Sequence, residues 1–320
     1  IWVGSNDGQL HLTKNGGRNW DNLTNNIDMP PWGTISNIEA SRFDKGTAYI
    51  SVDFHQMGDF DPYIYKTEDH GKSWKRISSD IPKSYSSFVH VIREDHKTPG
   101  VLYAGTDNGL YVSVDDGDNW KRIKNNLPPA PVYWISLQEH FDDMVIGTYG
   151  RGIFILDDIS PFRELSGANK ETINFLPVQD AYRFQTIQSM KNDGTSLIRG
   201  QNPAYGANLD FFLPDTNAKE VIIKILDMNG NVIRKITPQK TTKGVNRIMW
   251  DLRYERTKTP KLRVNPRGVD WVTYNKDGWR QLRTWDLDVN SGKLGPKAVP
   301  GEYRAVLKVC LLYTSDAADE

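Results

Sequence analysis

Short segments in which apolar and polar residues alternate recur along the chain, and turns rich in Gly, Asp and Asn separate them. Residues 101–106 and 109–114 show the pattern in the first half, and residues 220–227 and 231–237 show it in the second. A period of two residues is that of a β-strand with one buried face, and a short Gly-containing turn joins two such strands into a hairpin. The pattern therefore predicts an all-β chain.

An eight-residue segment with the pattern Ser/Thr-x-Asp-x-Gly-x-x-Trp recurs three times. The copies are residues 13–20, 67–74 and 113–120, with Asn in place of Asp in the first copy. Their starts lie 54 and 46 residues apart. A repeat of roughly 40–50 residues is the length of one four-stranded blade of a β-propeller, so the spacing predicts propeller blades.

The chemistry of the repeated segment is that of a structural turn. Its Asp or Asn can accept hydrogen bonds from nearby backbone N–H groups, and its Gly adopts a positive φ without a steric penalty. The Ser or Thr can fasten the other side of the turn, and the Trp is large enough to pin the turn against its neighbour. We therefore expect each Trp to be largely buried, and we interpret the following residues as structural: Thr13, Asn15, Gly17, Trp20, Thr67, Asp69, Gly71, Trp74, Ser113, Asp115, Gly117 and Trp120.

A second pattern of strand, tight Gly turn and strand spans residues 2–12, 103–113 and 145–155. Together with the eight-residue repeats it predicts four sets of strands, of which the first and the last are incomplete. Because so few blades cannot close a ring, we expect further blades upstream of residue 1. The expected strands are 1–5, 8–14 and 19–23 in blade one; 35–42, 47–53, 62–67 and 73–78 in blade two; 88–94, 101–106, 109–114 and 119–124 in blade three; and 133–139, 143–148 and 152–157 in blade four.

The repeated segments resemble the Asp-box repeats of bacterial neuraminidases, which sialidases and the sortilin propeller share. Residues 147–158 resemble the last blade of bacterial sortilin-like proteins, which are often labelled glycosyl hydrolases. The resemblance continues at residues 200–213 and 246–254, and so covers nearly the whole chain up to Val309. It implies a propeller protein that is exported to the periplasm, the cell surface or the medium. The spacing of Asp-boxes is a specific indicator of the fold but a weak indicator of any activity.

The second half is expected to hold a separate β-domain. The predicted fold is all-β: a partial β-propeller of four-stranded Asp-box blades over residues 1–160, a linker over 161–199, and an immunoglobulin-like β-sandwich over 200–309. Residues 255–300, rich in Lys, Arg, Pro and Gly, are expected to form an exposed insertion within the sandwich. The tail 310–320 resembles translated adapter sequence and is expected to be non-native; the alternative is an ordinary frayed terminus.

Composition narrows the possible partners. The chain has 40 Lys and Arg against 40 Asp and Glu, so its net charge gives no reason to expect nucleic acid or an anionic membrane. It has no stretch of about 18 apolar residues, so we expect no membrane span. Without Cys310, which opens the tail, no cysteine would remain for a disulfide. The six histidines show no metal-binding spacing, and we predict neither a metal nor a cofactor.

Strand direction predicts where a ligand site would lie. Strands alternate in direction within a blade, so the eight-residue turns lie at one end of the sheets. The loops between second and third strands lie at the other end, together with the loops between blades. Ligand sites of propellers usually use this other end, by analogy of fold. The candidates there are Arg151, Tyr149, Asp53, His55 and Trp32, with Asp107 and Tyr85 on the same side.

Several of these candidates also have a structural interpretation. Arg151 can bind a ligand carboxylate near the 53–62 loop, or it can pair with a local Asp and order its own turn. Trp32 can stack on a sugar or a peptide side chain. His55 can act as a base beside Asp53, or it can be a polar loop residue. The carboxylates of the 53–62 loop lack calcium-loop spacing, so we favour solvated turn residues over a cation site.

Two classes of function remain. The first is a binding or scaffold module that presents the propeller face to a peptide, a protein or a glycan. The second is a sialidase-like glycoside hydrolase, which needs an arginine cluster, a Tyr–Glu pair and an acidic proton donor. Only Arg151 and Tyr149 fit those roles here, so the other catalytic residues would lie in upstream blades. We therefore favour binding over catalysis.

Overall fold

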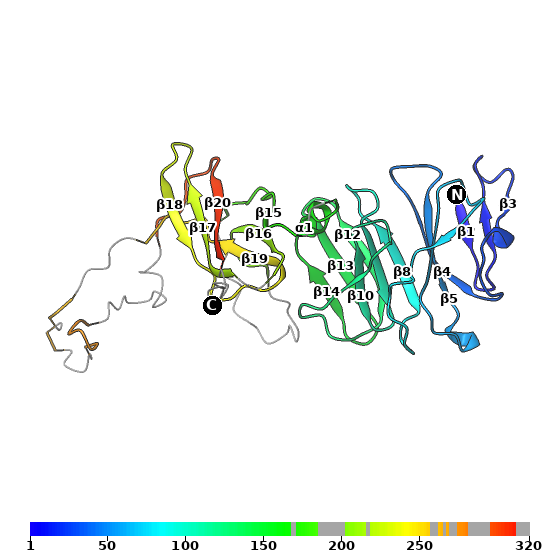
Figure 1. The fold of residues 1–320 in the computed structure, drawn as a ribbon, viewed down its shortest axis with the longest axis horizontal. Coiled ribbons are helices and arrows are strands. Elements are labelled where there is room, and N and C mark those ends of the chain that lie inside the picture. Colours follow the sequence, from blue (N-terminus) through cyan, green and yellow to red (C-terminus); the bar gives the residue numbers. More distant parts are fainter. Residues whose placement is uncertain are drawn as a thin grey trace, which may run out of the picture. The chain divides into compact units, whose positions relative to one another are not determined.

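A computed structural model describes residues 1–167, 171–184, 202–215, 218–256, 262–264, 267–268, 274–280 and 295–311 (Figure 1). The chain divides into two compact units, Ile1–Asn169 and Lys170–Glu320. Each unit is described by itself below. Among the described helices, none combines the length and the hydropathy that crossing a membrane requires.

The first unit consists of four small antiparallel sheets that lie side by side (Figure 1). In each sheet the strands follow one another in chain order, as in propeller blades. The strands are β1 (Trp2–Gly4), β2 (Leu10–Leu12) and β3 (Asp21–Asn22) in blade one; β4 (Thr34–Ala40), β5 (Ala48–Asp53), β6 (Tyr63–Thr67) and β7 (Lys75–Arg76) in blade two; β8 (Val89–Glu94), β9 (Leu102–Thr106), β10 (Gly109–Ser113) and β11 (Lys121–Ile123) in blade three; and β12 (Val132–Gln138), β13 (Asp143–Thr148) and β14 (Ile153–Leu156) in blade four. Short 3-10 helices, Thr24–Asn26 and His55–Met57, lie in the loops.

The core of this unit lies between neighbouring blades. Tyr49 and Ile64 of blade two pack with Ile92 and Leu102 of blade three, and all four are buried. Both faces of the inner sheets are covered, which explains the nearly continuous burial of β5, β8 and β9. The blades therefore stabilise one another through apolar contact, as expected for a fold of stacked sheets.

The first strands of blades two, three and four each contain a β-bulge at the same position. The pairing register shifts at Ser36 in β4, at His90 in β8 and at Tyr133 in β12. A bulge inserts one extra residue and re-aims its side chain. Three side chains of consecutive blades are thereby turned out of the regular alternation at one end of the sheets.

The eight-residue turns share one hydrogen-bond pattern. The hydroxyl oxygens of Thr13, Thr67 and Ser113 each accept the N–H of the turn glycine at 2.9 Å. The same hydroxyls donate to the side chains of Asn15, Asp69 and Asp115 at 2.8–3.0 Å, and these side chains accept a backbone N–H four residues further on. Hydrogen bonds from Ser73 lower the pKa of Asp69 to about 2.

The tryptophans of the three turns are buried to different extents. Trp120 is 3% exposed, and its Nε1 donates to the carbonyl of Ile77 in the preceding blade at 2.7 Å. Trp74 is half-buried and meets Trp2 of the preceding blade edge to face. Trp20 is 44% exposed, so the expectation of burial is wrong for this residue. The physical reason is its place: Trp74 and Trp120 pack on the preceding blade, and among the described residues no sheet precedes blade one.

The second unit contains two three-stranded antiparallel sheets. Their inward faces share a core that includes Leu209, Phe211, Ile223, Ile225 and Trp250. One sheet is β15 (Asn174–Phe175), β16 (Ala207–Leu213) and β19 (Gly244–Trp250), and the other is β18 (Val232–Ile236), β17 (Ala218–Leu226) and β20 (Arg304–Leu311).

Three details differ from the expected domain boundaries. The segment expected as a linker contributes helix α1 (Ser160–Glu164) to the first unit, where Phe162 packs on Tyr103, and β15 to the second. Strand β20 continues past Val309 through Cys310, which pairs with Glu220, to Leu311. The rest of the tail and most of the expected insertion lie outside the described residues.

Candidate functional site

The two ends of the blades have different chemistry. The eight-residue turns contact the loops between first and second strands: the N–H of His70 donates to Gly46, and that of Asp116 donates to Gly100. We call this the box end. At the opposite end, which we call the loop end, the N–H of Asp107 donates to Phe88 at 3.1 Å. The candidate residues of the second-to-third-strand loops therefore lie together with the inter-blade loops.

A continuous row of aromatic rings crosses the loop end of blades two to four. Ring centroids are 5.4 Å apart from Tyr85 to Phe60, 6.2 Å from Phe60 to Phe88 and 5.1 Å from Phe88 to His90. They are 4.0 Å apart from His90 to Tyr133 and 5.6 Å from Tyr133 to Tyr149. His55 stacks on Phe88 at 4.7 Å. The aromatic row therefore consists of Tyr85, Phe60, Phe88, His55, His90, Tyr133 and Tyr149.

Two repeated positions supply the centre of the row. The bulges of β8 and β12 aim His90 and Tyr133 toward each other. In the second strands, the residue that pairs with the position just before each bulge is Val52, Thr106 or Thr148. The next residue along the chain is Asp53, Asp107 or Tyr149. Equivalent positions of neighbouring blades lie side by side in a propeller, so the repeat itself gathers these side chains.

Two of these carboxylates are paired with histidines of the row. The Nδ1 atom of His55 lies 2.7 Å from a carboxylate oxygen of Asp53, and the Nε2 atom of His90 lies 3.2 Å from Asp107. Burial lowers the pKa of His90 and outweighs the opposing effect of Asp107, which favours the neutral form of the ring. Burial, followed by the charges of Asp107 and Asp53, raises the pKa of the Tyr133 hydroxyl. The centre of the row thus carries carboxylate charge that His90 does not cancel.

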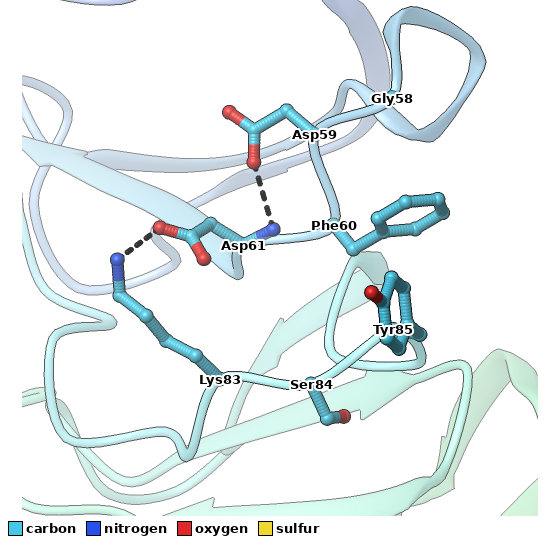
Figure 2. Close-up of a pocket in the computed structure, with 7 residues that line it drawn as sticks. All are labelled: Gly58, Asp59, Phe60, Asp61, Lys83, Ser84 and Tyr85. Atoms are coloured by element: carbon cyan, nitrogen blue, oxygen red, sulfur yellow. Dashed lines mark hydrogen bonds and ion pairs between the residues drawn. The ribbon is translucent and has the colours of Figure 1, made fainter.

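A hollow of about 430 Å³ lies beside the row, between the 53–62 loop and the loop that joins blades two and three (Figure 2). Phe60 and Tyr85 form one wall, and Lys83 pairs with Asp61 on another. Asp59 accepts the hydroxyl of Tyr63 at 2.6 Å. In the part of the chain that the structure describes, His, Cys, Asp and Glu do not gather into a group of three that could hold a metal ion.

The structure gathers only part of the predicted candidates. Tyr149, Asp53 and His55 belong to the row or to its carboxylate pairs, as described above. Arg151 is exposed, and among the described residues it has no hydrogen bond or ion pair with the 53–62 loop. Trp32 is exposed with a φ of 68° and lines a separate hollow of about 500 Å³ between blades one and two. The candidate site is therefore centred on the row, away from Trp32.

The sequence interpretation missed three members of the centre, namely Phe88, His90 and Tyr133. An alignment of the first strands of blades two, three and four would have shown Ser36, His90 and Tyr133 at one position. The available signal is a polar or aromatic residue at one shared position of the first strand in blades two, three and four.

Comparison with known proteins supports the blade architecture. Residues 7–151 match the sequence model of the sortilin-Vps10 family, described as sortilin, neurotensin receptor 3. The match runs from the first turn of blade one to the last turn of blade four. No curated protein matches the sequence. The in-order antiparallel sheets and this match together identify the first unit as blades of a β-propeller.

Solved structures with a similar fold include two hydrolases and one peptide complex. The GH74 enzyme of Niastella koreensis is 14% identical with a TM-score of 0.39, over 49% of this chain and 26% of that one. The GH74 xyloglucanase of Xanthomonas campestris is 13% identical with a TM-score of 0.40, over 76% of this chain and 37% of that one. YCF48 bound to D1 peptide is 15% identical with a TM-score of 0.34, over 74% and 63%. The chain spans less than two thirds of each of these structures.

Proposed function

We propose that this chain is part of a binding module that uses the loop end of its propeller blades to hold a peptide, a protein or a glycan. The observation that carries the proposal is the aromatic row. Tyr85, Tyr149 and Tyr133 are 84%, 72% and 50% exposed, although they lie in one continuous set of ring contacts. Large exposed rings gathered in one place mark interaction surfaces, whereas single exposed rings do not.

The second unit fits a supporting role in this proposal. Its two three-stranded sheets around one core favour an immunoglobulin-like β-domain. We propose that this domain spaces or docks the blades and that the protein is extracytoplasmic, as its resemblance to exported sortilin-like proteins suggests. Fractionation of cells that express the full-length protein tests this location, and recovery in the cytoplasm would contradict it.

The binding proposal can be tested by screening the purified protein on peptide and glycan arrays. We expect probes captured by the wild-type protein to be lost from a Tyr133→Ala/Tyr149→Ala variant, because the two rings that blade four contributes to the aromatic row are removed. Phe43→Ala serves as a matched control, since Phe43 is an exposed ring in the loop between β4 and β5, at the box end. Probes that bind equally to both variants would place the binding surface elsewhere.

We expect no hydrolysis of sialosides or aryl glycosides by this chain. Each of the two carboxylates at the centre of the row is hydrogen-bonded to a histidine, and the two do not form a pair of proton donor and nucleophile. Hydrolysis is measured as the release of the phenol from a panel of aryl glycosides and aryl sialosides. Turnover that disappears in Asp53→Asn, while Asp118→Asn at the box end retains it, would instead support the hydrolase alternative.

A further inference from the structure

Two carboxylates, those of Asp107 and Asp53, lie at the centre of the aromatic row. The carboxylates of Asp107 and Asp53 are the first two charged groups that act on the Tyr133 hydroxyl. The Asp107 side chain remains 25% exposed beside His90, so it is open to a ligand. The whole chain has a net charge of zero, so attraction of a cationic ligand would depend on local carboxylates such as these.

The same end of the blades already contains two internal cations, one over an aromatic ring and one paired with a carboxylate. The guanidinium of Arg76 lies 4.1 Å from the ring centroid of Tyr63, whose hydroxyl donates to Asp59. In the neighbouring hollow Lys83 pairs with Asp61, and the rings of Phe60 and Tyr85 line another side of the same hollow (Figure 2). In both sites the chain supplies its own cation.

Tyr133 and Tyr149 lie near carboxylates in the same way as Tyr63 but, among the described residues, have no internal cation over them. Their rings lie 5.6 Å apart at an interplanar angle of 35°, and the two residues are 50% and 72% exposed. In the described part of the chain, no Lys or Arg lies over either ring. Rings of this kind attract cations through their negative faces, and nearby carboxylates add a charge-assisted partner.

We propose that Tyr133, Tyr149, Asp107 and Asp53 bind an arginine side chain of a peptide or protein ligand. This inference rests on the proposed binding function of the loop end. Arginine is favoured over lysine because its planar guanidinium stacks on an aromatic ring and still directs several N–H donors toward a carboxylate. A neutral glycan would also stack on the rings and could donate hydroxyls to the carboxylates, but it would supply no positive charge to pair with them.

Fluorescence anisotropy with a fluorescein-labelled peptide of alternating Gly and Arg tests the proposal on the purified protein. We expect this peptide to bind more tightly than its Lys counterpart, and its Glu counterpart not to bind. Tyr149→Ala and Asp107→Asn should each weaken binding by about three- to thirty-fold, as expected for loss of a cation–π or charged contact. Phe43→Ala and Asp118→Asn, at the box end, should leave the affinity unchanged. Tyr149 is highly exposed, so its truncation tests the site without threatening the fold.

Three results would overturn the inference. The first is an absence of binding by the Arg peptide, and the second is equal weakening by the box-end variants. The third is binding of the Glu peptide that is lost in Arg151→Ala, which would identify a carboxylate ligand. Cellohexaose serves as a neutral competitor in the same assay. If cellohexaose binds through Tyr133 and the Arg peptide does not, the inference fails while the proposed function stands. If array probes bind independently of both tyrosines, the proposed function itself fails.

Discussion

Replacing Trp120 with Ala should lower the free energy of unfolding by about 3–5 kcal/mol, the usual cost of truncating a large buried aromatic residue. The ring is 3% exposed, packs among the core residues of blades two and three, and satisfies its N–H at the carbonyl of Ile77. The substitution leaves a cavity at a junction between blades. Urea unfolding followed by circular dichroism measures the loss.

The other two repeats provide matched controls for this substitution. Trp20→Ala should cost far less, because its ring is 44% exposed and buries little area. Trp74→Ala should fall between the two, since its half-buried ring meets Trp2. Equal costs at the three positions would show that the turn, and not packing on the preceding blade, determines the contribution of the Trp.

The contrast among the tryptophans shows what the repeat pattern could predict. The pattern fixes local chemistry, and the hydrogen bonds of the Thr67 and Asp69 turn recur in all three copies. Burial depends on a neighbour that the eight residues do not contain. A local motif therefore predicts a turn well and predicts the environment of its largest side chain poorly.

The candidate site was predictable to a similar degree. Strand direction was enough to select Asp53, His55 and Tyr149, because it fixes the end of the sheet at which a loop emerges. His90 and Tyr133 could not be selected in this way, because each lies at a β-bulge that shifts the pairing register by one residue. The sequence around His90 still alternates between apolar and polar residues, from Val89 to Val91, and so gives no sign of the bulge. Side chains on exposed turns, such as Arg151, depend on local contacts that strand direction does not specify.

Replacing Arg163 with Ala should destabilise the first unit by about 3–5 kcal/mol, the cost expected when one partner of a buried ion pair is removed. Arg163, in α1, donates to Asp95 at 2.8 Å and to Asp142 at 2.9 Å, and all three side chains are at most 9% exposed. These carboxylates come from the first loops of blades three and four, so the guanidinium joins the two blades. Without it, two buried carboxylates lose their main charged partner.

The ion pair of Arg163 with Asp142 also predicts how the stability of the first unit depends on pH. Burial alone would raise the pKa of Asp142, but hydrogen bonds and charges from Arg163 and Lys97 outweigh it and lower the pKa below the ordinary value of 3.8. A carboxylate whose pKa is lowered by folding adds stability above its unfolded pKa, and that stability is lost as the pH falls through the folded pKa. We therefore expect the stability difference between wild type and Arg163→Ala to be full near pH 7 and to shrink below about pH 4.

Arg42→Ala is the matched control, because Arg42 forms an ion pair with Glu139 at 2.5 Å but both side chains are more than half exposed. An exposed pair of this kind contributes about 0–1 kcal/mol. Urea unfolding of both variants at pH 7 and at acidic pH separates the two cases. If Arg163→Ala and Arg42→Ala lose stability equally, or if the loss in Arg163→Ala does not change in acid, the buried cluster does not join blades three and four in the way its geometry indicates.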